Sequence, residues 1–282
     1  MRSFYSLGGR GRLRVRETYV RDHLASWLSS RASGVAKVDL VLRGLAVVES
    51  EGLLDPDIRW DEIHDLIRPH NYYGDDRKLK RNWLGQKLER LEAENLLARA
   101  KSPGGRTRLH VLRDDASQLP LDDPGAAGDG YVSVLGDIFH FERIAPWGSP
   151  ELSAYFACMI AERYSRTAAA TAVFNEGRPW GGGIWFRELK WFADPAGLRP
   201  SSHVRVPFAE RTLRRGLVSL RSENLVATVR IYRDPRTGER FKQPQGRLLY
   251  RNGFSDLRSN RGVRARDLAM WAKGKGLIGG GP

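Results

Sequence analysis

The sequence predicts a mainly α fold with small β-hairpins (α+β), divided into two similar domains that a short linker joins. Three observations lead to this prediction. The eleven-residue segment 88–98 recurs as 217–227, with six identical positions. An arginine-rich segment with helical periodicity precedes each copy, and a basic segment typical of a β-hairpin follows it. A chain of 282 residues is also long enough to bury two separate cores.

The repeated segment predicts a helix that ends at an asparagine and continues as a strand. In the first copy, Leu88 and Leu91 are three residues apart and therefore share one helical face, and the second copy has the same spacing. Asn95 and Asn224 stand where each helix must stop. Asparagine tolerates the left-handed backbone conformation that closes a helix C-terminus. The apolar residues that follow in each copy begin an extended run.

The first predicted domain spans residues 17–113 and follows a flexible basic arm, 1–16, that is rich in glycine and arginine. Asp75 or Asp76 is the expected N-cap of its last helix, because a carboxylate there accepts hydrogen bonds from free backbone N–H groups. A Pro-Gly-Gly turn joins the two strands that follow the repeat. The predicted helices span 17–30, 35–51, 57–68 and Asp76 to Glu94, and the hairpin spans 99–112.

The second predicted domain spans 131–254 and follows a linker, 114–130, that is rich in Asp, Pro, Ala and Gly. Ser149-Pro150-Glu151 is a typical helix start, with Ser as N-cap and Pro in the first turn. A basic C-terminal tail, 255–282, is expected to follow the domain. The predicted helices span 149–174, 184–193 and 208–223, the hairpin spans 228–250, and 131–141 is partly extended.

A helix followed by a basic β-hairpin resembles the recognition helix and wing of winged-helix (winged helix-turn-helix) DNA-binding domains. The Leu-x-x-Leu-x-x-Glu-Asn-Leu-Leu pattern of 88–97 is similar to the Leu-x-x-Leu-x-x-x-Gly-Leu-Ile pattern common in that superfamily, with Asn95 where Gly is usual. The resemblance covers 57–112 and 149–251 and selects no family within the superfamily. It implies two tandem winged-helix domains and double-stranded DNA as the partner.

The charge distribution favours an anionic partner. Most of the excess positive charge lies near the two ends of the chain. The net charge is +14 and the pI is about 10.2. Residues 1–21 carry +5 and residues 208–282 carry +11. Residues 22–121 are balanced, with 16 basic and 16 acidic side chains, and residues 122–207 carry −2. The second predicted recognition helix therefore begins the most basic part of the chain.

The second recognition helix is predicted to face DNA with the side opposite its leucines. Arg211 and Arg215 are like-charged neighbours one turn apart, which costs helix stability unless an anion lies between them. This cost favours a functional role over an ordinary solvated face. The predicted DNA contacts of this helix are Arg211, Thr212, Arg214 and Arg215.

The first recognition helix carries amides beside its basic side chains. Asn and Gln can read adenine and Arg can read guanine. Because the surrounding domain has no net charge, an ordinary solvated helix is the alternative interpretation. The predicted contacts here are Lys78, Arg81, Asn82 and Gln86.

Basic residues outside the helices are predicted to contact phosphates or the minor groove, which positions a protein without specifying sequence. The arm contains an Arg-Gly-Arg core similar to an AT-hook, without that motif's flanking prolines. These candidates are Arg10 and Arg12 in the arm, Arg106 and Arg108 in the first wing, and Arg236 and Lys242 in the second.

The residue patterns give no support for catalysis, and we expect no cofactor and no metal. The chain has no phosphate-binding glycine loop, and its six His are scattered. Its single cysteine, Cys158, lies in an apolar stretch and is interpreted as a core residue. Without an 18-residue apolar run or a signal-peptide core, the expected location is cytoplasmic, on the nucleoid, and no membrane partner is expected.

These observations predict a sequence-specific double-stranded DNA-binding protein, interpreted as a transcriptional regulator whose second domain supplies most of the affinity. A plasmid or phage replication initiator, reading adjacent major grooves of a repeated origin site, is the main alternative, and a partition (centromere-binding) protein is another. A protein-interaction platform also stays open, although the +11 segment argues against it. Self-association is not required, because two recognition helices in one chain can replace the two subunits of a dimer.

Overall fold

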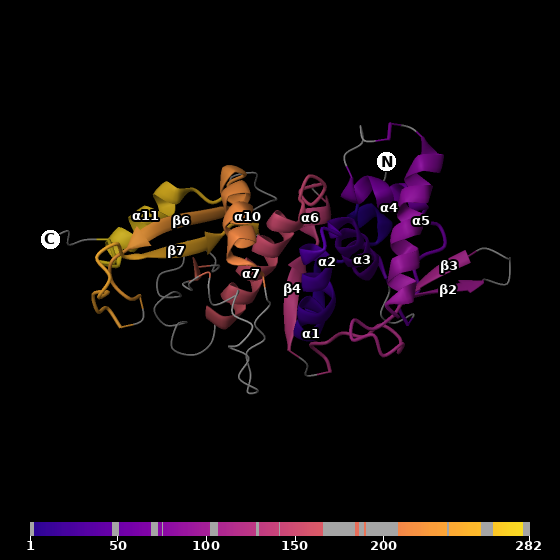
Figure 1. The fold of residues 1–282 in the computed structure, drawn as a ribbon, viewed down its shortest axis with the longest axis horizontal. Helices are drawn as coiled ribbons and strands as arrows, with labels where there is room; N and C mark the ends of the chain where they lie inside the picture. Colours follow the sequence, from indigo (N-terminus) through magenta and orange to yellow (C-terminus); the bar gives the residue numbers. More distant parts are fainter. Residues whose placement is uncertain are drawn as a thin grey trace. The chain divides into compact units, whose positions relative to one another are not determined.

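The computed structural model combines helices with small antiparallel sheets, which confirms the α+β combination predicted from the sequence. The chain divides into two compact units, Met1–Leu152 and Ser153–Pro282, which are described separately below (Figure 1). The structure describes residues 3–278 except 47–50, 69–72, 75, 102–106, 128–129, 141, 166–183, 186–188, 190–207, 236 and 255–261.

The N-terminal segment is folded into the first unit, which corrects the expectation of a flexible basic arm. Strand β1 (Arg12–Arg16) pairs antiparallel with β4 (Tyr131–Leu135). Leu13 and Val15 are buried on one face of β1, so the alternation of basic and apolar residues belongs to a strand. Because β4 belongs to this sheet, the start of the predicted second domain lies in the first unit.

The first unit is centred on three helices that pack against one another: α3 (Ser33–Leu45), α4 (Trp60–Ile67) and α5 (Arg77–Ala93). All three match predicted helices, although α3 ends six residues earlier than expected. Asp76 accepts hydrogen bonds from the backbone N–H groups of Lys78 and Leu79, which confirms it as the N-cap of α5. The other helical elements are η1 (Tyr5–Leu7), α1 (Glu17–Tyr19), η2 (Val20–Leu24), α2 (Ala25–Ser29) and α6 (Asp137–His140).

A hairpin follows α5, as predicted. Strands β2 (Leu97–Lys101) and β3 (Thr107–Val111) pair antiparallel, and Leu53 forms a bridge with His110 on the other edge of β3. The predicted turn at 103–105 lies outside the described residues.

The predicted linker is attached to the first unit. Asp114 is buried and pairs with Arg16, whose guanidinium also pairs with Asp122 at 2.7 Å. These ion pairs hold the segment against β1, so the boundary between the compact units falls at Leu152 rather than within 114–130.

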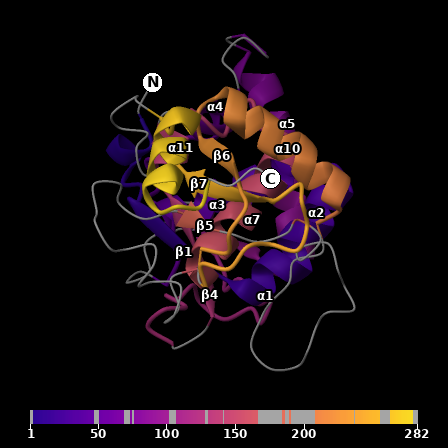
Figure 2. The same ribbon diagram turned by 90° about the vertical axis from the view of Figure 1, so that its left-hand side faces the viewer.

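The second unit contains α7 (Ser149–Ser165), which begins just before the boundary, and a three-stranded sheet in the order β5–β7–β6. Helices α10 and α11 both contact β6 (Figures 1 and 2). The remaining elements are β5 (Ile184–Trp185), α10 (Glu210–Ser222), β6 (Val226–Ile231), β7 (Arg247–Asn252) and α11 (Ala265–Gly274).

Three predictions for this unit need correction. Ile184 and Trp185 form a strand rather than the start of an aromatic helix, because they complete the sheet beside β7. Most of the remaining residues of that predicted helix lie outside the described ones. The described part of the segment after 262 is not an appended tail, since Leu268 and Ala272 of α11 are buried in the same core as Ile231. Strand β7 also begins at Arg247, later than the expected position 239.

The two hairpins have the same surroundings in their own units. Each is preceded by a helix, and its second strand pairs on the far side with a short extended segment from earlier in the chain. That segment is Leu53 in the first unit and β5 in the second. The order of elements around the repeat is therefore duplicated.

The repeat adopts the same backbone geometry in both copies, which confirms the predicted asparagine caps. Asn95 and Asn224 are left-handed, with φ of 58° and 57°. The backbone N–H of Leu96 donates to the carbonyl of Leu91 at 3.0 Å, and the equivalent bond from Leu225 to Leu220 is 2.8 Å. With the bonds from Asn95 to Glu92 and from Asn224 to Arg221, both helices end in a complete Schellman motif.

Candidate nucleic-acid interface

Helix α5 presents a largely polar face to solvent, because most of its large apolar residues are buried on the opposite side; Leu79, in the first turn, is exposed. Leu84, Leu88 and Leu91 are fully buried at helical spacing. The four candidates of this helix, Lys78, Arg81, Asn82 and Gln86, are all exposed.

Helix α10 is amphipathic in the same sense, with Leu213, Leu217 and Leu220 buried. Arg211 and Arg215 are exposed, and their guanidinium groups form no ion pair or hydrogen bond with any residue that the structure describes. Two unpaired cations one turn apart repel each other, so an anion placed between them would stabilise the helix.

The other two candidates of α10 are less available. Arg214 is exposed but forms an ion pair with Glu210, one turn before it, which partly neutralises its charge. Thr212 is half-buried on the flank of the helix. Arg211 and Arg215 therefore carry most of the uncompensated positive charge among the predicted contacts of α10.

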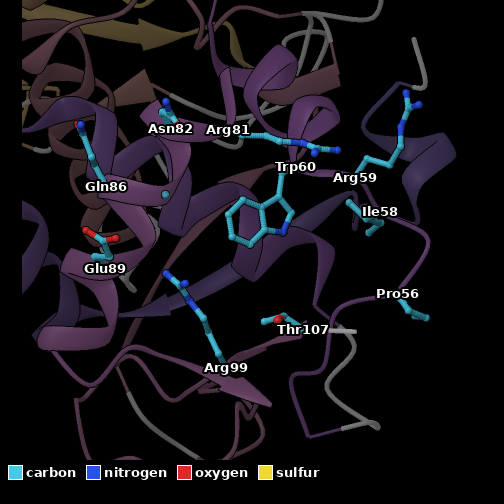
Figure 3. A pocket seen from close by; sticks show the side chains of 11 residues that line it. Pro56, Ile58, Arg59, Trp60, Arg81, Asn82, Gln86, Glu89, Arg99 and Thr107 are labelled. Atoms are coloured by element: carbon cyan, nitrogen blue, oxygen red, sulfur yellow. The ribbon is translucent and has the colours of Figure 1, made fainter. Parts of the chain in front are cut away.

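A groove of about 760 Å³ lies along the polar face of α5, between the beginning of α4 and the hairpin strands (Figure 3). Trp60 is drawn at its centre, and the guanidinium carbon of Arg99, on β2, lies 5.8 Å from the Trp60 ring centroid. The guanidinium of Arg99 is also held by Glu92 at 2.7 Å. The groove is lined by Asn82, Gln86, Glu89, Arg81, Gly85, Arg59, Trp60, Arg99, Thr107, Pro56 and Ile58.

Several groove residues are absent from the predicted contacts, notably Arg59, Trp60, Glu89 and Arg99. Glu89 lies inside the first copy of the repeat, on the same face as Asn82 and Gln86, so helical periodicity alone could have identified it. Trp60 and Arg99 reach the groove through the packing of α4 and the hairpin, which local sequence does not reveal.

The C-terminal end of α5 is fixed by the carboxylate of Glu94. It accepts hydrogen bonds from the Trp27 indole at 2.9 Å and from Arg90 at 3.0 Å. Burial acts to raise the pKa of Glu94, but hydrogen bonds from Trp27, Arg90 and His23 outweigh it and lower the pKa below its usual value. An ionised Glu94 thereby ties helix α2 to the end of α5.

The candidates outside the helices have mixed positions. Arg10 donates from Nη2 to the Arg43 carbonyl at 2.6 Å, so part of its guanidinium serves the fold. Arg12 is exposed on β1, and Lys242 is exposed after β6. Arg108 is half-buried on β3, with its Nε atom buried and without a partner among the described residues. Arg106 and Arg236 lie outside the described residues.

Cys158 is buried on α7, which confirms its interpretation as a core residue, and burial raises the pKa of its thiol. In the described part of the chain, no group of three or more His, Cys, Asp or Glu side chains could hold a metal ion. Among the same residues, no helix combines the length and apolar character needed to cross a lipid bilayer.

The chain matches no known protein-family model, and no curated protein or solved structure is similar enough to count as a match. The two helix faces and the groove are the features of the molecule that point to a function.

Proposed function

We propose that this chain is a sequence-specific double-stranded DNA-binding protein with two winged-helix domains, in which α5 and α10 are the recognition helices. One observation carries the proposal: two helices with exposed polar faces end in the same Schellman motif and continue into equivalent hairpins. A helix of this kind fits the major groove of B-DNA, and a hairpin beside it contacts the backbone.

The distribution of charge supports the same function. Arg211 and Arg215 are exposed and unpaired within the described residues. Residues 208–282, which include α10 and its hairpin, carry a net charge of +11. Neutralisation of phosphates by such a surface releases counterions and supplies most of the affinity for DNA.

For the biological role we propose transcriptional regulation on the bacterial nucleoid. The presence of two recognition helices in one chain also favours a second candidate, a replication initiator of plasmid or phage type, whose two domains would occupy neighbouring major grooves. Genome-wide occupancy of the tagged protein separates the two roles. Occupancy at promoters supports the regulator, and occupancy confined to repeats beside a replication origin supports the initiator.

DNA binding itself is tested by fluorescence anisotropy of the full chain with a labelled duplex at a series of salt concentrations. The logarithm of the association constant should fall linearly with the logarithm of salt concentration, with a slope of roughly −0.9 per phosphate contacted. An affinity that does not change with salt would contradict the proposal.

The contribution of α10 is tested with the double variant Arg211→Ala/Arg215→Ala. It should weaken binding by about 100-fold, since each contact of this type contributes on the order of 1–3 kcal/mol. The matched control is Lys273→Ala/Lys275→Ala, which removes the same charge from exposed positions at the end of α11. Equal losses in the two variants would indicate a general charge effect and reject α10 as the recognition helix.

A further inference from the structure

We infer that the two helices read different base pairs, so that the DNA site consists of two unlike blocks and is neither a palindrome nor a direct repeat. This inference rests on the proposed function and adds the identity of the bases. It arises from a comparison of α5 with α10 at structurally equivalent positions.

The equivalence of positions follows from the shared end of the two helices. Both end in the same hydrogen-bonded motif, at Asn95 and Asn224, which are 129 residues apart. The buried leucines of the two helices obey the same offset: Leu84, Leu88 and Leu91 correspond to Leu213, Leu217 and Leu220. The two helices therefore turn equivalent faces toward solvent.

On that outward face, the offset relates Asn82 to Arg211, Gln86 to Arg215 and Glu89 to Val218. All six side chains are exposed, and Val218 is 64% exposed. None of the six side chains has a hydrogen bond or ion pair with another residue in the described part of the chain. These positions are therefore available to a ligand in both units. In each of the three pairs, however, the two side chains differ in chemistry.

The face of α5 offers two amides followed by a carboxylate, and all three line the groove. An Asn or Gln amide pairs bidentately with the N6 and N7 atoms of adenine. A Glu carboxylate accepts a hydrogen bond from the N4 amino group of cytosine. The expected order of base pairs along α5 is A·T, A·T and C·G.

The face of α10 offers two guanidinium groups followed by an aliphatic side chain. Arginine pairs bidentately with the O6 and N7 atoms of guanine. Val218 lies one turn after Arg215 and exposes its methyl groups in the middle of a polar surface, where they suit the 5-methyl group of thymine. The expected order of base pairs along α10 is G·C, G·C and T·A.

At each of the three equivalent positions, one helix therefore prefers an A·T pair where the other prefers a G·C pair. A palindrome or a direct repeat would offer the same block to both helices. One helix would then face three wrong pairs, each of which costs about tenfold in affinity or more.

The test is selection of the full chain against a library of random double-stranded DNA, followed by sequencing of the bound fraction. The expected motif has two blocks with opposite base-pair composition. The variant Asn82→Arg/Gln86→Arg/Glu89→Val gives α5 the outward chemistry of α10, and its selected site should consist of two similar G·C-containing blocks. The single variant Glu89→Val should change one pair of the first block from C·G to T·A and leave the rest.

Thermal unfolding of each variant checks that these exposed substitutions preserve the fold. If the unaltered chain selects a palindrome or a direct repeat, the inference is wrong while the proposed DNA binding stands. If the triple variant selects the original motif, the assignment of α5 is wrong. If no sequence is enriched and no duplex is bound, the proposed function fails together with the inference.

Discussion

The two units share the joint between helix and hairpin but differ in how they use charged side chains. In the first unit, many charges pair inside the fold: Arg43 with Asp39, both 1% exposed, and Lys80 with Asp65 at 2.7 Å. In the second unit, Arg211 and Arg215 face solvent without a partner among the described residues. The count of charges in a segment therefore does not show how many of them a ligand can reach.

This difference assigns different tasks to the two proposed recognition helices. Residues 22–121 contain as many acidic as basic side chains, so α5 would contribute selectivity mainly through its amides and a carboxylate, with Lys78 and Arg81 as the exposed cations beside them. Helix α10, in the basic part of the chain, would contribute most of the affinity.

The largest effect on stability is expected at the buried ion pair of the first unit. Asp39 accepts hydrogen bonds from Arg43 Nε at 2.7 Å and from the Tyr19 hydroxyl. Asp39→Ala leaves the Arg43 guanidinium buried without its counter-ion, which should lower the free energy of unfolding by about 3–5 kcal/mol. Urea denaturation followed by circular dichroism measures the loss.

The matched change in the second unit is Glu210→Ala, which removes the exposed partner of Arg214 at the same i, i+4 spacing. Because solvent screens this pair, the expected loss is below about 0.5 kcal/mol. Similar losses in the two variants would show that the units do not differ in their use of charge.

The features that could be predicted from the sequence are those set by neighbouring residues. The buried faces of α5 and α10, the Asp76 N-cap and the asparagine caps follow from spacing and from the conformational preferences of single residues. The outward positions of Asn82 and Gln86 follow from the same periodicity.

The features that could not be predicted depend on partners distant in the chain. Basic and apolar residues alternate along 12–16, and it is the pairing with 131–135 that makes this segment a strand rather than an arm. Trp60 and Arg99 become part of one groove through the packing of α4 and the hairpin against α5. Local periodicity carries no information about such long-range contacts.

The next effect concerns Lys37, a buried cation of the first unit that donates to the Ala145 carbonyl at 2.8 Å. Burial, with a further contribution from Arg68, lowers its pKa to about 8. Above pH 8 the folded state loses this proton while the unfolded state keeps it, up to a pKa near 10.4. The contribution of this group to the free energy of unfolding therefore increases with pH across that interval, by about 2–3 kcal/mol.

Tyr19 and Cys158 also affect stability in this range, because burial raises their pKa values in the folded state while the same side chains ionise at their ordinary pKa values in the unfolded state. The measurement is therefore the difference in unfolding free energy between the unaltered chain and Lys37→Met at pH 7.5, 9 and 10.5. The Met variant should be relatively most stable at pH 7.5 and lose that advantage as pH rises. A difference that is constant over this range would contradict a buried, proton-releasing Lys37.

The asparagine joints test what the two units share, and the penalty for an alanine in the left-handed position should be the same in both. Asn95→Ala and Asn224→Ala each force a side chain without a polar group into a left-handed conformation, which costs about 1 kcal/mol. Asn224→Gly should be neutral or slightly stabilising, because glycine adopts this conformation without strain, whereas Asn95→Gly also removes the exposed hydrogen bond that Gln118 donates to the Asn95 side chain at 2.9 Å. The hydrogen bonds that close the two helices match. The difference in unfolding free energy between the Ala and Gly variants should therefore agree between the two sites to within about 0.5 kcal/mol. A large difference at one asparagine only would show that the two joints, although alike in sequence and backbone, are held by different forces.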